Sequence, residues 1–171
     1  MPPAVLITGG ARRIGAAIAR PCCQVGWHVI IHHRDSHDEA EALAAALPSA
    51  EAVACDLADG DASVALIEAL ATRLPDWRVL VNNASVFHHD DTARLDPAVL
   101  AEAMAVNAAT PMRMAQAYLA RATAKGGRRV IRHCGRSTRM MLRTLYSCPP
   151  RWDEPLSLIT CPSTVTRSPS R

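Results

Sequence analysis

The chain has 171 residues, of which 49% are hydrophobic, 20% charged and 4% aromatic. This composition fits one globular domain and excludes collagen, coiled-coil and wholly disordered classes. No apolar run approaches the roughly eighteen residues that span a bilayer, and the first residues lack a basic segment followed by a long apolar one, so we expect a cytoplasmic protein with no membrane partner. Six cysteines without a Cys-x-x-Cys spacing predict free thiols in a reducing compartment.

Short aliphatic runs alternate with amphipathic stretches along the first part of the chain. The runs predict strands at residues 5–7, 27–31, 52–55, 78–81 and 129–131. The stretches predict a helix that begins at residue 14 and further helices at residues 37–47, 62–74 and about 97–124. Such alternation predicts an α/β fold, a doubly wound parallel sheet (Rossmann-like) that is truncated after about the fifth strand. Ligands of these sheets bind beyond the carboxyl ends of the strands.

A glycine-bearing turn, residues 8–15, follows the first predicted strand and opens a helix. Free N–H groups at the start of a helix favour a phosphate. Gly9 and Gly10 would let the backbone approach that phosphate, and Gly15 would let the helix pack close to the strand. Because the turn lacks the Gly-x-Gly-x-x-Gly spacing, an ordinary strand-to-helix turn is an equally good interpretation of these residues alone.

The second predicted strand ends in a charged segment. Arg34 and Ser36 favour the 2′-phosphate of NADP, whereas Asp35 would repel that phosphate if it pointed inward. A solvated charged loop is the alternative. A zinc site is disfavoured because His32 and His33 project to opposite faces of a strand.

Polar motifs also follow the third and fourth predicted strands. Together with the turn, they resemble in order and spacing the short-chain dehydrogenase/reductase family over about residues 4–131, and within it the pteridine reductase branch. Pteridine reductases share the arginine, here Arg13, that replaces the middle glycine of the family turn. The resemblance implies NADP(H) as the cofactor. It implies a cofactor-binding set of Thr8, Gly9, Arg12, Arg13, Ile14, Gly15, His33, Arg34, Ser36, Asp56, Leu57, Asn82, Asn83 and Ala84.

The same resemblance implies residues that contact the substrate. Arg13, Ser85 and Phe87 would bind it, with Phe87 stacking over a flat pterin ring. Asn107 would order a water molecule in the proton relay and is the catalytic residue that the resemblance supplies. The alternatives are a core aromatic for Phe87, and for Asn107 a side chain that hydrogen-bonds back to its own helix or faces solvent.

The family's Tyr-x-x-x-Lys pair, which donates a proton to the substrate and holds the cofactor ribose, is absent from this chain. The only lysine is Lys125. Tyr118 is followed at the fourth place by Ala122 and Tyr146 by Pro150, so we assign neither tyrosine a catalytic role. The resemblance therefore covers the cofactor-binding half of the family fold.

The composition changes after about residue 131. Residues 1–130 contain 31 alanines and residues 131–171 none, and the second segment carries seven basic against two acidic residues. We therefore predict an NADP-binding, Rossmann-like domain at residues 1–131 and an aberrant or disordered tail at 132–171. Arginine outnumbers lysine 18 to 1, as GC-rich DNA would produce, so a shifted reading frame is our hypothesis for the tail. A disordered extension is the alternative, which Cys134, Cys148, Trp152 and Cys161 disfavour.

The leading hypothesis is an NADPH-dependent reductase that transfers hydride to a small molecule, a dihydropterin or a dihydrofolate-like substrate. A variant of this hypothesis keeps the family and has a 3-oxoacyl thioester as the substrate. The alternative is a noncatalytic NADP-binding pseudoenzyme or a truncated fragment. Nucleic-acid binding by the tail arginines and a metal site at residues 88–91 are weaker interpretations. The resemblance also implies a homotetramer, assembled partly through the helix at 97–124.

Overall fold

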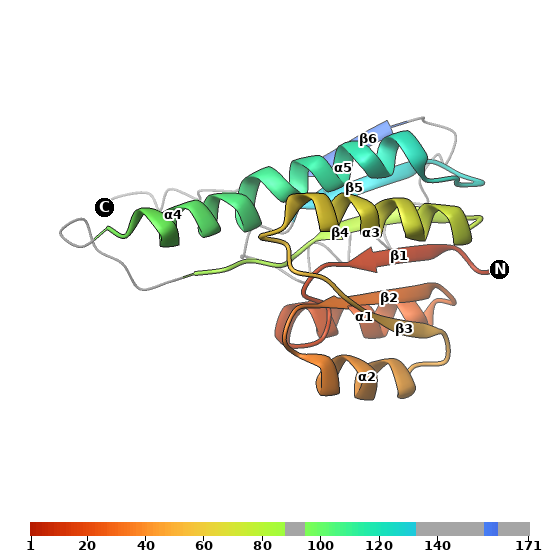
Figure 1. Ribbon diagram of the computed structural model, residues 1–171. Coiled ribbons are helices and arrows are strands. Elements are labelled where there is room, and N and C mark those ends of the chain that lie inside the picture. Colours follow the sequence, from red (N-terminus) through yellow and green to blue (C-terminus); the bar gives the residue numbers. More distant parts are fainter. Residues whose placement is uncertain (88–94, 133–155, 161–171) are drawn as a thin grey trace, which may run out of the picture.

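A parallel sheet forms the middle layer of the computed structural model, which describes residues 1–87, 95–132 and 156–160 (Figure 1). Its strands are β1 (Ala4–Ile7), β2 (His28–His33), β3 (Ala50–Ala54), β4 (Trp77–Asn82), β5 (Arg128–Arg132) and β6 (Leu156–Thr160). They lie in the order β3-β2-β1-β4-β5-β6, and every neighbouring pair is parallel. The chain thus runs outward from β1 and returns to its other side with β4, which creates a switch point between β1 and β4.

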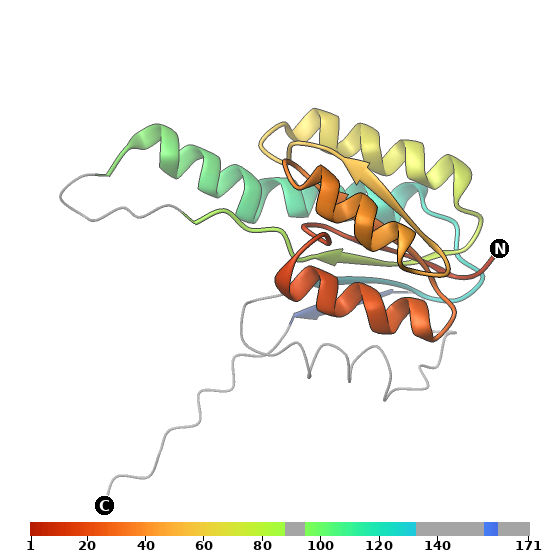
Figure 2. The same ribbon diagram turned by 90° about the horizontal axis from the view of Figure 1, so that it is seen from below.

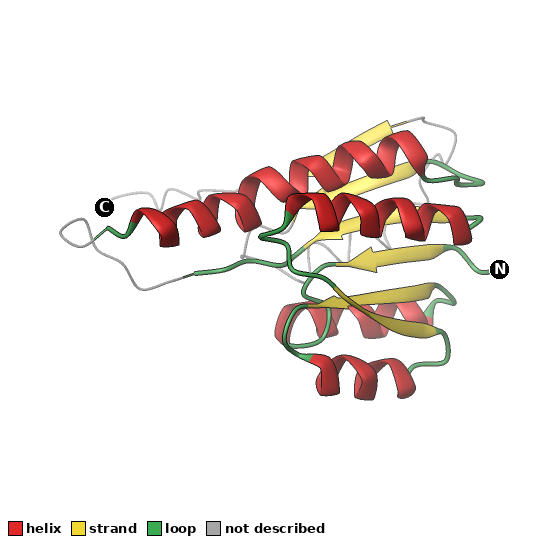
Figure 3. Cartoon of the chain, viewed as in Figure 1, coloured by secondary structure: helices red, strands yellow, loops and turns green. Residues whose placement is uncertain are grey.

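Helices cover both faces of the sheet (Figure 3). The helices α1 (Arg13–Gln24) and α2 (His37–Ala45) pack on one face, and α3 (Gly60–Arg73) and α5 (Thr110–Arg121) pack on the other. In Figure 2 the strands lie between α1 below and α3 above. Right-handed crossovers produce this arrangement when the chain reverses direction across the sheet. The predicted doubly wound α/β fold is therefore confirmed.

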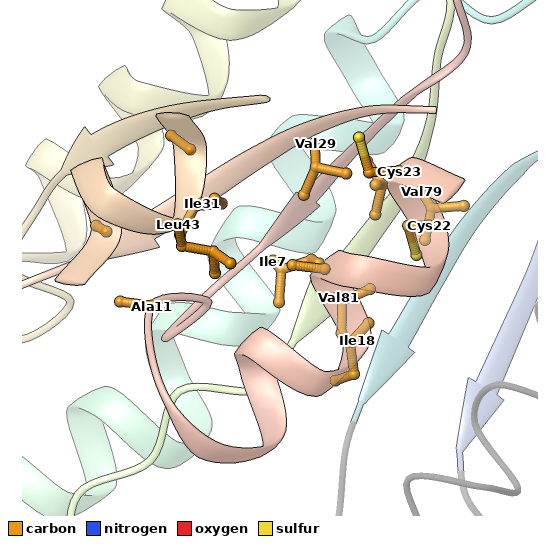
Figure 4. Packing of buried hydrophobic residues seen from close by; sticks show 14 of the residues in the cluster. Ile7, Ala11, Ile18, Cys22, Cys23, Val29, Ile31, Leu43, Val79 and Val81 are labelled. Carbon is orange, nitrogen blue, oxygen red and sulfur yellow. The ribbon is translucent and has the colours of Figure 1, made fainter. Parts of the chain in front are cut away.

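Alternation along the central strands supplies two hydrophobic cores. Val5 and Ile7 of β1 belong to the core under α1 and α2, whereas Ala4 and Leu6 belong to the core under α3 and α5. Each of the four is 2% exposed or less. Figure 4 shows the first core, in which Ile7 lies with Ile18 of α1. Burial on both faces explains why the strands read as unbroken aliphatic runs in the sequence.

The helix predicted at 97–124 is interrupted by a π-helical turn and ends earlier than expected. The structure has α4 (Pro97–Met104), the π turn η1 (Ala105–Ala109) and α5. Pro111 has no N–H to donate to the carbonyl of Asn107, four residues before it, so regular α-helical bonding cannot continue there. That carbonyl instead accepts a hydrogen bond from Arg132 at the end of β5 (2.7 Å). The helix α4 extends beyond the carboxyl edge of the sheet (Figure 1).

The sheet contains one strand more than the sequence predicted. Within residues 132–171, where we expected no ordered element, β6 pairs in parallel with β5. Without β6, the outer edge of β5 would have unpaired backbone groups. A run rich in leucine, isoleucine and threonine is suited to form the strand that pairs with them. The surrounding Ser, Pro and Arg residues hid this short run. In the part of the chain that the structure describes, no helix has the length and apolarity to cross a membrane.

Candidate functional site

A cavity of about 750 Å³ opens at the carboxyl ends of β1 to β4, beside the switch point. Cavities of this size hold small organic ligands. The lining residues are Gly9, Ala11, Arg12, Arg13, Ile14, Gly15, His32, His33, Arg34, Asp35, Ser36, Asp56, Leu57, Asn83, Ala84, Ser85, Val86, Val106, Asn107 and Arg132. The structure thus brings together all the predicted site residues except Thr8, Asn82 and Phe87.

Close backbone approach shapes the turn between β1 and α1. Gly9 has a φ of +60°, in the left-handed region that favours glycine. A Cβ added to Gly15 would lie 2.7 Å from the Cα of Gly10 and would also clash with the backbone of Gly9. Arg13 has a φ of +50°, which costs a residue with a Cβ about 1 kcal/mol and which a glycine adopts without strain. The helix therefore begins close to the strand, as the glycine pattern predicts.

The first turn of α1 faces the cavity and is suited to an anion. Among the described residues no side chain caps this helix, and its first turn contains no acidic residue. The guanidinium of Arg12 instead donates to Glu39 of α2 at 3.2 Å. Within the described ranges the N–H groups of the first turn therefore have no side-chain acceptor, and the helix dipole adds partial positive charge at the same place.

Thr8 and Asn83 hold the glycine turn against the end of β4. The hydroxyl of Thr8, a residue only 1% exposed, accepts hydrogen bonds from the backbone N–H groups of Asn83 (2.9 Å) and Ala84 (3.0 Å). It donates to the carbonyl of Val81 at 3.3 Å. The Asn83 amide donates to the carbonyls of Thr8 (2.9 Å) and Gly9 (3.1 Å). Thr8 therefore does not line the cavity itself but holds in place two residues that do, Asn83 and Ala84.

Two further predicted residues do not line the cavity. The amide of Asn82 donates to the carbonyl of Pro111 in α5 at 3.4 Å, and its Oδ1 is buried with no partner among the described residues. Phe87 is 81% exposed, so the alternative of a core aromatic is wrong. Residues 88–91, considered above only as a weaker interpretation for a metal site, lie outside the described residues. Within the described ranges no group of three His, Cys, Asp or Glu side chains is placed to hold a metal ion.

The end of β3 contributes a short turn to the cavity. The carboxylate of Asp56 accepts from the N–H of Ala58 at 2.9 Å, which leaves its second oxygen for other donors. The hydroxyl of Thr110 donates to the carbonyl of Leu57 at 2.8 Å. This bond fixes the turn after β3 against the start of α5.

Arg34 is the charged centre of the cavity's outer end. Its Nε donates to Asp35 at 2.7 Å, and a terminal nitrogen donates to Glu102 of α4 at 3.3 Å. The hydrogen bond with Asp35 raises the pKa of Arg34 further, so the guanidinium stays charged. Asp35 thus faces the arginine, and both line the cavity together with Ser36 and His33.

Asn107 also lines the cavity, and its side chain is bonded to the segment after β4. Its Oδ1 accepts from the backbone N–H of Val86 at 2.9 Å, and its Nδ2 donates to the carbonyl of Val86 at 2.8 Å. The side chain therefore holds the segment after β4, and neither alternative considered for it applies. Arg132, which donates to the backbone carbonyl of Asn107, also lines the cavity. Arg132 was not among the predicted site residues because it falls in the predicted tail, residues 132–171.

His32 is a second residue that the sequence analysis did not place in the site. It is 2% exposed, and its Nδ1 accepts from the N–H of Gly9 at 3.1 Å. Its Nε2 therefore carries the proton and donates to the carbonyl of Cys55 at 3.0 Å. One neutral imidazole thus joins the glycine turn to the end of β3. Burial lowers the pKa of His32 from 6.5 to about 4.

This pKa predicts a loss of stability in mild acid. Between pH 6.5 and about 4 the unfolded chain takes up a proton at His32 that the folded chain excludes, so stability is full above pH 6.5 and falls as the pH decreases. We expect this residue to contribute up to about 3 kcal/mol to that fall. Urea unfolding at a series of pH values measures it. In His32→Asn the amide oxygen can still accept from Gly9 but does not titrate, so an equally steep fall in that variant would contradict the assignment.

The fold and this site together define the class of Rossmann-like proteins with a glycine turn at the switch point of a parallel sheet. A family model of short chain dehydrogenases matches residues 3–147, most of the chain. The chain belongs to the short chain dehydrogenase family. The matched range extends past residue 131, where the sequence analysis ended the resemblance.

The match to each individual relative covers only part of that relative's length. The FolM alternative dihydrofolate reductase 1 of Brucella suis, solved in complex with NADP, is 34% identical with a TM-score of 0.70 over 76% of this chain and 56% of that chain. The dihydromonapterin reductase of Citrobacter koseri is 32% identical over 64% of this chain and 45% of the relative. The L-rhamnose 1-dehydrogenase (NAD(P)(+)) of Azotobacter vinelandii is 39% identical over 49% of this chain and 36% of the relative. The chain thus spans less than half of these two curated relatives.

Proposed function

We propose that the cavity binds NADP(H). The single observation that carries this proposal is that one cavity joins an open helix N-terminus to Arg34 and Ser36 at the end of β2. Two anionic groups of one ligand would find donors there, the first at the N–H groups of α1 and the second at the guanidinium. The relative solved with NADP supports the same choice of cofactor.

The residues fit the other parts of this cofactor. Asp56 has a carboxylate oxygen left to accept from an adenine amine, and Leu57 supplies an apolar contact. Asn83 and Ala84 form the wall near β4, where their backbone is held by Thr8. His33 lines the cavity beside Arg34 and belongs with Ser36 to the end that would hold the 2′-phosphate.

The reaction that we propose is reduction of a dihydropterin or a dihydrofolate-like substrate. When bound, the nicotinamide supplies the hydride. Arg13 and Ser85 line the cavity and would contact the substrate, and Phe87 follows them on the exposed segment after β4. Asn107 holds Val86 in place and would order a water molecule for proton transfer. The names of two relatives, a dihydrofolate reductase and a dihydromonapterin reductase, support a pterin-type ring.

A turnover measurement tests this reaction. Because this chain lacks the Tyr-x-x-x-Lys pair, the measurement is made on the protein with that pair restored. We expect the restored protein to oxidise NADPH, followed by absorbance, when a dihydropterin or dihydrofolate is added, and to do so more slowly with a 3-oxoacyl thioester. Oxidation with the thioester alone would move the chain to another substrate class. Binding of NADPH without oxidation by any of these compounds would overturn the proposed reaction and leave the cofactor site standing.

A noncatalytic NADP-binding protein is the second candidate, and the Arg132 contact favours it. The permanently charged guanidinium of Arg132 donates a hydrogen bond to the backbone carbonyl of Asn107. Tyr118 lies in the core under α3 and α5, where its hydroxyl donates to the carbonyl of Trp77 at 3.2 Å and burial raises its pKa. Among the described residues no tyrosine therefore lines the cavity. If NADPH binds and no substrate is turned over, this candidate replaces the reductase.

We also propose that the tail at 132–171 derives from a shifted reading frame. The loss of alanine and the change of charge support this hypothesis. Resequencing the DNA across about codons 125–150 tests it. We expect one inserted or deleted base to restore an alanine-rich frame with Tyr-x-x-x-Lys, whereas an unchanged frame would favour a genuine extension. A cytoplasmic location and a homotetramer remain proposals for the intact protein.

A further inference from the structure

An ion pair crosses the outer end of the cavity from one element to another. Glu102 of α4 contacts a terminal nitrogen of Arg34 at 3.3 Å, although 68 residues separate the two in the sequence. The side chains are 32% and 45% exposed, so water and ligands reach both. Glu102 lies in the last turn of α4, the helix that extends past the carboxyl edge of the sheet in Figure 1.

The guanidinium of Arg34 donates to two carboxylates, and the two hydrogen bonds differ in length. Asp35 is the next residue in the chain and accepts from Nε at 2.7 Å, whereas Glu102 belongs to another element and accepts at 3.3 Å. A phosphate binds arginine best through two adjacent N–H donors, and the Glu102 contact occupies a terminal nitrogen. An incoming phosphate dianion therefore meets a competing carboxylate, and the longer, inter-element contact is the one that it would displace.

We propose that Glu102 is a specificity-determining residue, whose carboxylate competes with the cofactor's 2′-phosphate for Arg34 and so weakens NADPH binding selectively. The inference rests on the proposed NADP(H) site. NADH has a free 2′-hydroxyl in place of the phosphate, so its binding does not require the Arg34–Glu102 contact to break. Glu102 thus sets how strongly the site distinguishes the two cofactors, and binding of the phosphorylated one releases α4 from β2.

Titration calorimetry of Glu102→Gln with NADPH and with NADH tests the proposal. Glutamine keeps the size of the side chain and removes its charge. We expect NADPH to bind about three- to tenfold more tightly than to the unmodified chain, from the loss of an exposed competing ion pair and of repulsion toward the phosphate. We expect NADH affinity to stay within about twofold. The matched control is Glu68→Gln, because Glu68 also pairs with an arginine at 3.3 Å, Arg121, away from the cavity.

Each other result overturns the proposal. Unchanged NADPH affinity in Glu102→Gln, or an equal gain for NADH or in Glu68→Gln, would show that Glu102 does not compete for Arg34. Weaker NADPH binding would show that Glu102 orients the arginine for the phosphate instead. These outcomes leave the proposed cofactor site intact because the unmodified chain still binds NADPH. Absence of binding by the unmodified chain would overturn the proposed function and this inference together.

Discussion

Replacing Gly15 by alanine is expected to weaken cofactor binding severely. The added Cβ would lie 2.7 Å from the Cα of Gly10 and would clash with the backbone of Gly9, and neither neighbour is a flexible side chain that can move aside. The turn must therefore move away from α1, which takes its N–H groups out of position for a phosphate. Overpacking of this kind costs about 3 kcal/mol or more, so we expect NADPH affinity to fall by at least about a hundredfold. Calorimetric titration measures this loss.

A second glycine-to-alanine substitution serves as the control, because it adds the same methyl group where no backbone atom is in the way. A Cβ at Gly60, at the start of α3, would meet the flexible guanidinium end of Arg113, which can turn aside. We expect Gly60→Ala to leave NADPH affinity within about twofold and stability within about 0.5 kcal/mol. Tight NADPH binding by Gly15→Ala would show that the turn is not the phosphate site.

Replacing Thr8 by valine is expected to lower the stability of the fold. Valine keeps the shape of threonine and removes the hydroxyl, so the N–H groups of Asn83 and Ala84 lose their common acceptor. Because each donor left without a partner away from water costs about 1–3 kcal/mol, we expect a loss of about 3 kcal/mol in the free energy of unfolding. Urea denaturation measures the loss.

Thr8→Ser is the control for this prediction. Serine keeps the hydroxyl that binds Asn83 and Ala84 and loses only a buried methyl group, which costs about 1 kcal/mol. If the valine and serine variants were equally stable, the hydroxyl would not be what holds the end of β4 against the glycine turn.

Local sequence patterns were sufficient for the frame of the fold and for most of the cavity. The strands are unbroken aliphatic runs because both of their faces are buried, as at Val5 and Leu6. Arg34 and Ser36 could be placed in the site because residues that follow parallel strands meet at one edge of the sheet. The π turn at Asn107 was also implicit in the sequence, since Pro111 follows it at the fourth place, but the pattern of apolar residues continues through it.

Contacts between distant elements could not be read in the same way. His32 was considered only as a metal ligand, and its link between Gly9 and Cys55 depends on how three segments meet. Glu102 reaches Arg34 because of the position of α4, for which an amphipathic pattern gives no sign. Asn82 was expected at the cofactor because its neighbours are there, but strand alternation turns its side chain toward α5.

The most direct test of the account is a calorimetric titration of the unmodified chain with NADPH and NADH, repeated with Arg34→Ala. We expect NADPH to bind at least about tenfold more tightly than NADH, because charge-assisted bonds from Arg34 hold the 2′-phosphate. We expect the alanine variant to lose that preference while retaining its affinity for NADH. Failure of the unmodified chain to bind either dinucleotide, or a preference for NADPH that persists in Arg34→Ala, would contradict the account.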